Sequence, residues 1–546
     1  MTPITINAFL GANLAFDESL LPEGVGVHSL NQRPGFGDMR PWNEPGATAA
    51  TVPASPQRRT IYRMGQGVAS DSDYWLSWSS VVHATIGFDS DDTSERTYYT
   101  GDGAPKWTDN IRGLFGGAPY PQAWRELGVP APETAVTATL AVDGTGTATA
   151  TSYRYTYVND LGWESAPSPV GNTILLAPGG TVNLAGFAAP PAGSYGITTV
   201  RLYKLAVGAS GAAEYFFLRD WPYGAAPTNP IDDARSVGSA ILETEGWRVA
   251  PADGKGIRKL WNGMLSIGTG NAIRVCVPYK PYAYPLAYEV SLGAAFVAQA
   301  VVGQRVLVLT TGDARIASGS TVPLDDDPAG VNRPCSSAQS VVEFNEGFAI
   351  KGAAWASEDG LCWWGEGTGF ALVTEKLLTR EQWQAMVPSS MVAGRYGRFY
   401  VCFYNDGTLK GFILDPQNPQ GIYFLSTGYN AVFRDPLTDR LYVLAGSNVR
   451  QWDAGTAMTA TFKSKLVQLP QPTNIGAIEV IAKAWPVTVR MWASGTLRYE
   501  QTFSSPDQIG RPSGGWESDE LQFEVTSAHR VIAVRAALSV SDLNSA

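Results

Sequence analysis

The chain has 546 residues, of which 44% are apolar and 16% charged, so its composition excludes a disordered protein and allows about two to four domains. Its net charge of -10 and pI near 5.0 disfavour tight wrapping around nucleic acid. The N-terminal residues lack the basic segment and apolar core of a signal peptide, and no apolar run of about 18 residues occurs, so we expect a protein made in the cytoplasm without membrane insertion.

Glycine, proline and large aromatic residues dominate the local pattern. The chain contains 58 Gly and 36 Pro beside 17 Trp and 23 Tyr. Gly and Pro favour tight turns, whereas large aromatic side chains suit half-buried pleated surfaces. The sequence therefore predicts an all-β protein made of many short strands.

Residues 1–132 are expected to form an N-terminal β region that contributes blades to an irregular β-propeller. Three aromatic segments with the pattern strand, turn, strand support this expectation: RRTIYRMG, DSDYWLSWSS and ERTYYTGDGAPKWTD. Pro130 and Pro132 mark the end of this region, and Pro251 marks the end of the region that follows.

Residues 133–250 differ in composition, being rich in Thr, Ala and Gly. In SYRYTYVND, Tyr153, Tyr155 and Tyr157 alternate with Arg154 and Thr156, so the tyrosines share one face of a strand. The later segment VRLYKLA is expected to pair with AEYFFLRDW. We interpret the region as an inserted β-sandwich of the fibronectin or immunoglobulin type.

Residues 251–455 contain four predicted hairpins, each with Asn, Asp or Ser next to Gly at its turn. These hairpins span residues 257–279, 352–367, 397–415 and 439–453. Such turn residues tolerate the positive φ that a tight hairpin needs. Each hairpin resembles half of a propeller blade, so this region is expected to supply further blades of the β-propeller.

Only one segment favours a helix, residues 374–387, where Thr379 could cap the first turn and Trp383 would face inward. After it, residues 456–546 return to alternating strands, with a turn at residues 493–496 between VTVRMW and LRYEQTF. This last region is expected to form a C-terminal β-sandwich.

The segment ASEDGLCWWGEGTG, residues 356–369, concentrates chemically versatile side chains. Glu358, Asp359 and Glu366 invite comparison with a glycosidase, whose two carboxylates lie about 5 to 9.5 Å apart. Glu358 and Asp359, however, fall on the predicted turn beside Gly360, where carboxylates are solvated and their pKa values have little reason to rise. We therefore assign no catalytic residue here.

The same segment partly matches the Asp-box of sialidase propellers through Ser357, Asp359 and Trp364, although Gly360 follows the aspartate directly and no second copy occurs. Even a complete Asp-box stabilises a hairpin. We expect a blade hairpin in which Cys362 and Trp364 face one way and Leu361 and Trp363 the other. One of the two tryptophans should pack within the blade and the other against an adjacent blade, domain or subunit.

Other candidate sites are weakly supported. His28, His83 and His529 lack the spacing of a zinc-binding helix or a catalytic triad. The acidic runs at residues 88–95 and 324–330 could offer oxygen ligands to Ca²⁺ but lack EF-hand spacing, so exposed acidic loops are the favoured interpretation. The glycines of GTGNA and GEGTG precede neither a helix nor a lysine. No metal or cofactor is assigned.

The four cysteines lie far apart and outside any CxxC or Cys/His cluster. They are Cys276, Cys335, Cys362 and Cys402. Each stands in an apolar or aromatic context, which favours buried free thiols over a zinc site or a disulfide framework.

The sequence from Tyr153 to about Asp453 resembles a group of tailed-bacteriophage virion proteins, in particular the tail nozzle or tail-hub proteins of short-tailed phages. The motifs that carry the resemblance are NDLGWESAPSP, TTVRLYKLAVG, AEYFFLRDW, WNGMLSIGTGNAIRVCVPYKPYAYPLAYE, VLVLTTGDARIASGS, ASEDGLCWWGEGTG and TREQWQAMVPSSMVAGRYGRFYVCF. The segment TFKSKLVQLPQPTNIGAIEVIA fits the same pattern.

This resemblance implies a structural protein of the virion tail, a β-propeller with inserted sandwiches, arranged as a homo-oligomeric ring, a hexamer, around the DNA exit channel. It implies contacts with adaptor or portal-proximal proteins and with tail fibres. An acidic chain also suits a conduit through which DNA passes without tight binding. The alternative is a carbohydrate-binding or polysaccharide-degrading tail protein, in which Trp75, Trp78, Trp363 and Trp364 could stack on sugars. Aromatic residues at alternate strand positions, however, more often belong to a core.

Overall fold

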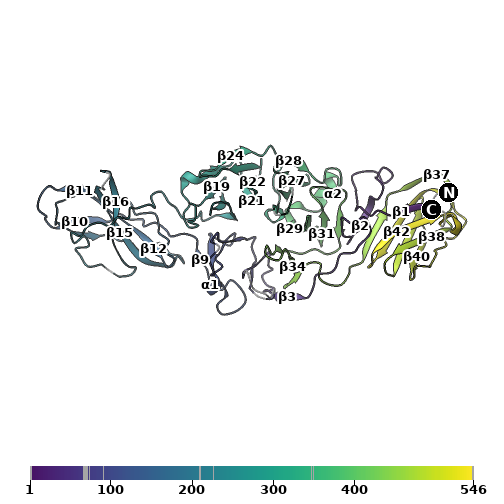
Figure 1. Ribbon diagram of the computed structural model, residues 1–546, viewed down its shortest axis with the longest axis horizontal. Coiled ribbons are helices and arrows are strands. Elements are labelled where there is room, and N and C mark those ends of the chain that lie inside the picture. The colour runs from purple at the N-terminus through teal and green to yellow at the C-terminus, as the bar shows by residue number, and fades with distance from the viewer. Residues whose placement is uncertain are drawn as a thin grey trace. The chain divides into compact units, whose positions relative to one another are not determined.

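The computed structural model describes residues 3–65, 72, 74–89, 91–207, 211–225, 227–345, 347–348 and 350–543. Strands account for 44% of the residues and helices for 5%, which confirms the all-β prediction (Figure 1). The chain divides into two compact units. The first comprises Met1–Val81, Val297–Ile316 and Pro328–Ala546, and the second comprises Val82–Phe296 and Ala317–Asp327. No described helix is long and apolar enough to cross a bilayer.

Consecutive four-stranded antiparallel sheets are the main repeating element. Two of them consist of β6 (His83–Ile86), β7 (Thr97–Thr100), β8 (Lys106–Thr108) and β9 (Arg125–Glu126), and of β17 (Lys255–Lys259), β18 (Leu265–Thr269), β19 (Ala272–Val275) and β20 (Glu289–Ser291). A third consists of β21 (Phe296–Val302), β22 (Arg305–Thr310), β23 (Arg315–Ser318) and β24 (Asp325–Pro328). Propeller blades are built from such sheets, while closure of the blades into one propeller stays a prediction.

Strand β24 corrects the expectation of an exposed acidic loop at residues 324–330, because it pairs with β23 as the last strand of its sheet. Its residues Asp325 and Asp327 are exposed, as charged side chains on edge strands often are. The other acidic run, residues 88–95, is turn and loop as expected; Ser90 lies outside the described residues.

The first unit contains two more four-stranded sheets and, at one end of a larger sheet, a further run of four antiparallel strands. They consist of β25 (Val342–Phe344), β26 (Gly352–Ala356), β27 (Leu361–Gly365) and β28 (Gly369–Leu372); of β29 (Val392–Tyr396), β30 (Phe399–Asn405), β31 (Leu409–Leu414) and β32 (Tyr423–Leu425); and of β33 (Val432–Arg434), β34 (Leu441–Ala445) and β35 (Asn448–Gln451) with β3 (Thr48–Thr51). Strands β4 (Thr60–Arg63) and β5 (Trp75–Trp78) form a separate pair.

All four predicted hairpins of residues 251–455 are confirmed by the strand pairing. The turns lie between Thr269 and Ala272, Ala356 and Leu361, Asn405 and Leu409, and Ala445 and Asn448. Gly270 and Gly446 adopt φ values of +48° and +64°, the left-handed conformation that these tight turns require.

The inserted region folds within the second unit into three small sheets. They are β10 (Thr137–Val142) with β14 (Thr181–Ala185), β11 (Thr149–Thr151) with β13 (Ile174–Leu176), and β12 (Tyr153–Asn159) with β15 (Ile197–Val207) and β16 (Ala213–Pro222). The predicted pairing of β15 with β16 is confirmed. Tyr153, Tyr155 and Tyr157 are all fully buried, as expected for one shared face directed into a core.

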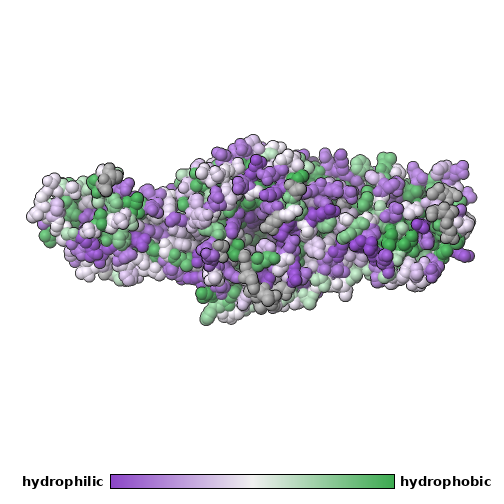
Figure 2. Space-filling model, in the orientation of Figure 1, coloured by the Kyte–Doolittle hydropathy of each residue, from purple (hydrophilic) through white to green (hydrophobic). Residues whose placement is uncertain are grey.

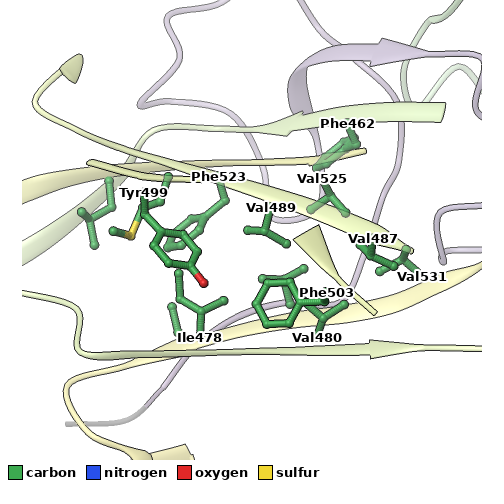
Figure 3. Close-up of a cluster of buried hydrophobic side chains, with 14 of the residues drawn as sticks. Phe462, Ile478, Val480, Val487, Val489, Tyr499, Phe503, Phe523, Val525 and Val531 are labelled. Carbon is green, nitrogen blue, oxygen red and sulfur yellow. The ribbon is translucent and has the colours of Figure 1, made fainter. Parts of the chain in front are cut away.

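The C-terminal strands also form sheets in the first unit. They are β36 (Ala460–Ser464), β37 (Val467–Thr473), β38 (Ala477–Ala482), β39 (Val487–Ala493), β40 (Thr496–Phe503), β41 (Ser518–Ser527) and β42 (Val531–Ala537). Their core contains apolar side chains alternating along β39 and β41, among them Val487, Val489, Phe523 and Val525 (Figure 3).

Two N-terminal strands depart from the expectation that residues 1–132 supply blades alone. Strand β1 (Ile4–Ile6) pairs with β42, and β2 (Gly26–Leu30) pairs with β36 and, through Leu30 and Phe424, with β32. The β2 strand thereby joins the C-terminal strands and β29–β32 into one ten-stranded sheet. Apolar residues of β1, Ile4 and Ile6, pack against the core of Figure 3.

Helices are short in the described part: α1 (Asn110–Leu114), α2 (Arg380–Ala385) and α3 (Val540–Leu543), with 3-10 turns at Leu286–Tyr288, Ala338–Ser340 and Pro388–Ser390. The predicted helix at residues 374–387 is confirmed only over α2. Thr379 caps it through a reciprocal hydrogen-bond pair with Gln382, and Trp383 is buried. Pro388 explains the early end, because the residue before a proline disfavours helical geometry, and Val387 has a φ of +54°.

Candidate functional site

The segment of residues 356–369 forms the hairpin of β26 and β27. Ser357 organises its turn: the hydroxyl donates to the carbonyl of Gly360 at 2.8 Å and accepts from the backbone N–H groups of Asp359 and Gly360, each at 3.2 Å. A buried serine that satisfies the turn backbone in this way is engaged in structure. The partial Asp-box match therefore corresponds to a stabilised hairpin.

The carboxylates of this segment do not form the pair that a glycosidase needs. Asp359 makes ion pairs with Arg380 at 2.9 Å and with Arg333 at 3.3 Å. Both carboxylate oxygens of Asp359 are thus engaged in ion pairs within the protein. Glu358 and Glu366 are exposed to solvent on the two turns that flank β27. The hairpin thus offers no buried carboxyl group suited to acid catalysis.

The two tryptophans of β27 lie on opposite faces, as predicted, with Leu361 beside Trp363 and Cys362 beside Trp364. Both are nearly buried, with exposed fractions of 5% and 4%. As expected, one of them packs within its own blade, because Trp363 lies edge to face against Phe344 of β25 at 5.4 Å. The Trp363 face packs in a cluster that includes residues of β30 and β31, and the Trp364 face packs in a cluster that includes residues of β21 and β22.

The tryptophans proposed to stack on sugars are therefore unavailable as flat exposed platforms. Trp75 and Trp78 are also buried, and Trp75 contacts Tyr442 and Phe433 edge to face at 4.9 and 5.7 Å. Large aromatic side chains at alternate strand positions fill cores in this way.

A cavity of about 360 Å³ nevertheless lies beside Trp363. Its walls come from three segments: residues around β28, the turn at residues 373–377 and the loop at residues 416–419. Polar groups on the wall belong to Trp363, Thr368, Glu375, Lys376 and Gln417. The sequence did not reveal this site because residues about 40 positions apart meet there without a common motif.

The histidines and the acidic run singled out from the sequence do not come together in one site. His28, His83 and His529 lie on or beside β2, β6 and the turn before β42, respectively. Among the described residues, no group of three or more His, Cys, Asp or Glu side chains could hold a metal ion. In the acidic run at residues 88–95, Asp92 accepts hydrogen bonds from the backbone N–H of Ser94 and from its hydroxyl, which is a local turn interaction.

The expectation of buried free thiols is confirmed for all four cysteines. Burial raises the pKa of Cys276, Cys335 and Cys362 to about 12, and it raises the pKa of Cys402 above its ordinary value as well. A thiol becomes nucleophilic or metal-binding as the thiolate. These side chains therefore serve as small apolar groups of the cores.

No family model and no curated protein matches the chain. Among solved structures, it is similar to an exo-β-1,3-galactanase from Phanerochaete chrysosporium with β-1,3-galactotriose, at 7% identity and a TM-score of 0.22, covering 52% of this chain and 95% of the galactanase. A second structure of the galactanase aligns at 8% identity and a TM-score of 0.17, covering 73% and 100%.

The extracellular domain of a one-component system protein from B. thetaiotaomicron aligns at 8% identity and a TM-score of 0.22, over 83% of this chain and 47% of that domain. The chain thus spans about half of that domain. Alignments this weak carry no argument about activity, substrate or partners.

Proposed function

We propose that the protein is a structural component of a bacteriophage tail, a nozzle or hub ring that surrounds the DNA exit channel and contacts neighbouring tail proteins. The motifs between residues 153 and 453 support the virion assignment by resemblance. The side chains of those motifs also suit a structural protein, because the segment of residues 356–369 uses its serine, aspartate and tryptophans to hold a hairpin and two cores.

One observation supports self-association most directly: the loop of residues 109–124 in the second unit, which includes α1, exposes large apolar side chains. Three of its large side chains are exposed, Ile111 by 71%, Phe115 by 82% and Trp124 by 41%. Figure 2 shows green apolar atoms gathered near the position that α1 has in Figure 1. Contiguous exposed apolar surface usually marks a contact with another macromolecule. We assign this loop to the contact between copies of the chain in the ring.

The loop is held by its own hydrogen bonds. Asp109 caps α1 by accepting from the backbone N–H of Arg112 at 2.7 Å, and Arg112 also pairs with Asp160 at 2.7 Å. The carboxamide of Gln122 donates to the carbonyls of Gly117 and Pro119 at 2.7 and 3.1 Å. A loop ordered before association loses little conformational entropy when it is buried, which favours a stable interface.

Assembly can be tested on the purified full chain. Light scattering coupled to size exclusion and electron microscopy should detect closed rings, and Phe115→Asp combined with Ile111→Asp should reduce them to smaller species. Leu437→Asp is the matched control, since Leu437 is 54% exposed in the other unit and should leave the rings intact. A wild-type protein that stays monomeric at every concentration would contradict the proposed ring.

Passage of DNA through such a ring requires weak interaction with phosphates. The net charge of -10 supplies long-range repulsion rather than attraction. Accordingly, duplex DNA should show no measurable retention by the protein at physiological salt. Lowering the ionic strength should produce no retention either, because weaker screening strengthens the repulsion.

A second candidate is a carbohydrate-binding tail protein, and the cavity beside Trp363 favours it over a polysaccharide-degrading enzyme. The cavity offers polar groups at an apolar wall, the usual composition of a small-ligand site. Catalysis is less well supported, because Asp359 is held by two arginines. Incubation with bacterial polysaccharides should therefore release no reducing ends.

A further inference from the structure

The cavity beside Trp363 has the size of a small-ligand site and is partly open to solvent. Its volume of about 360 Å³ lies at the lower end of the range for such sites, roughly 300 to 1,000 Å³. The apolar wall consists mainly of branched and proline side chains: Ile350, Leu372, Val373, Leu377, Pro416 and Pro419. This wall excludes a highly charged ligand and suits the C–H surface of a compact molecule.

Trp363 contributes an indole N–H to this wall. Its side chain is 95% buried, since only 5% is exposed, and it packs edge to face against Phe344 at 5.4 Å. Within the described residues, nothing accepts a hydrogen bond from its indole N–H. By contrast, the equally buried Trp383 donates to the carbonyl of Ser357 at 2.8 Å. An indole N–H on the cavity wall can donate a hydrogen bond to a ligand oxygen.

Other residues that line the same cavity carry further hydrogen-bond donors and acceptors. Glu375 and Lys376 are exposed neighbours, and neither has an ion-pair partner in the described part of the chain. Gln417 donates from its carboxamide nitrogen to the carbonyl of Ile350 at 2.9 Å, which fixes the amide and leaves its oxygen as an acceptor. The hydroxyl of Thr368 can act in either role.

We propose that this cavity binds a neutral monosaccharide or disaccharide. Sugar hydroxyls both donate and accept, so they match an indole N–H and an ammonium on one side and a carboxylate and an amide oxygen on the other. A hydrocarbon would use none of the polar groups of the wall. A multiply charged anion would meet Lys376 but also the adjacent carboxylate of Glu375, which repels it.

The sugar site does not depend on assembly of the protein into a tail ring. Ring formation is measured by molecular mass and imaging, and sugar binding by ligand contact, so either proposal can fail while the other stands. Binding also implies no cleavage, because no step of bond breaking is assigned to Glu375 or to any other residue of the wall.

Saturation-transfer NMR and calorimetry on the full chain with glucose, galactose and N-acetylglucosamine test the proposal. At least one sugar should bind with a Kd of about 1 mM or tighter. Trp363→Phe removes the indole N–H and keeps the packing, and Glu375→Ala removes a surface acceptor without touching the core. Each should weaken binding at least about fivefold. Glu358→Gln, on the opposite turn of the same hairpin, should leave binding unchanged.

Three results would overturn the sugar site. The first is the absence of saturation transfer from all three sugars. The second is sugar binding that neither Glu375→Ala nor Trp363→Phe weakens. The third is displacement of the bound sugar from an unaltered cavity by an aliphatic alcohol of similar size, which would indicate an apolar site. Because Glu375 is exposed, its variant should fold even if Trp363→Phe does not.

Discussion

The indole N–H of Trp383 donates a hydrogen bond of 2.8 Å to the carbonyl of Ser357, and both residues are 1% exposed. This bond fastens the short helix α2 to the turn of the β26–β27 hairpin. Trp383→Phe keeps a ring in the core but leaves the carbonyl without this donor, so we expect the free energy of unfolding to fall by about 1–3 kcal/mol. Chemical denaturation followed by circular dichroism measures the loss.

Trp124→Phe is the matched control for that substitution. Trp124 is 41% exposed, so at a protein concentration low enough to keep the chain monomeric the same chemical change there should leave the unfolding midpoint nearly unchanged. Equal losses in both variants would mean that the hydrogen bond between Trp383 and Ser357 does not hold α2 against the hairpin.

The buried cysteines lead to a second prediction. Burial raises the pKa of Cys276, Cys335 and Cys362 to about 12, so at mildly alkaline pH the folded protein contains very little thiolate at these positions. A disulfide reagent such as DTNB should modify almost no thiol in the native chain and all four cysteines after unfolding. Rapid modification of one thiol in the native protein would contradict the packed, unreactive state.

Local patterns made much of the fold predictable. The turns of four hairpins follow from Asn, Asp or Ser beside Gly, and the burial of Tyr153, Tyr155 and Tyr157 follows from their alternation along one strand. These signals act within a few residues of chain. The same is true of the cap at Thr379.

Long-range pairing was not predictable in the same way. Strand β1 consists of three residues that could pair with any open edge, and its pairing opposite Ala536 depends on how the whole C-terminal core packs. Likewise, the cavity at Trp363 brings Glu375 and Gln417 together from separate segments. Sequence alternation placed Trp363 on a face of β27, but it gave no information about the neighbour on that face.

His28 on β2 predicts a specific pH dependence. Burial is the largest influence and lowers its pKa below the ordinary 6.5; Lys463 lowers it further, and Glu524 opposes the change. The unfolded chain therefore binds this proton more readily than the folded one. The contribution of His28 to the free energy of unfolding is fully present above about pH 6.5, where the imidazole is neutral in both states, and is lost as the pH falls below that value.

Urea denaturation between pH 7 and pH 5 checks the His28 effect, because most carboxylates titrate below that window, near about pH 4. The wild-type midpoint should decrease as the solution is acidified through the window, and His28→Gln should flatten that decrease. A variant whose midpoint changes with pH as steeply as that of the wild type would assign the effect to another group.

Adjacent aspartates in the inserted region provide the sharpest stability test. Asp232 is fully buried; it accepts from the Tyr153 hydroxyl at 2.7 Å and pairs with the Lys204 ammonium at 2.6 Å. Burial, followed by Asp232, raises the pKa of Tyr153, so that hydroxyl stays protonated and continues to donate. Asp232→Ala leaves Lys204 uncompensated and should lower the free energy of unfolding by about 3–5 kcal/mol.

Asp233→Ala supplies the comparison, because Asp233 forms a surface ion pair with exposed Arg235 and its loss should change stability little. The two variants differ by one position in the chain and remove the same chemical group. Thermal unfolding should therefore show a large decrease in midpoint temperature for Asp232→Ala but not for Asp233→Ala.

A double variant tests the pairing of Asp232 with Lys204. Removing Asp232 alone leaves the Lys204 ammonium without its counter-charge, whereas removing both side chains does not. Asp232→Ala combined with Lys204→Met should therefore recover part of the lost stability. An additive double variant would show that the two side chains do not act as a pair.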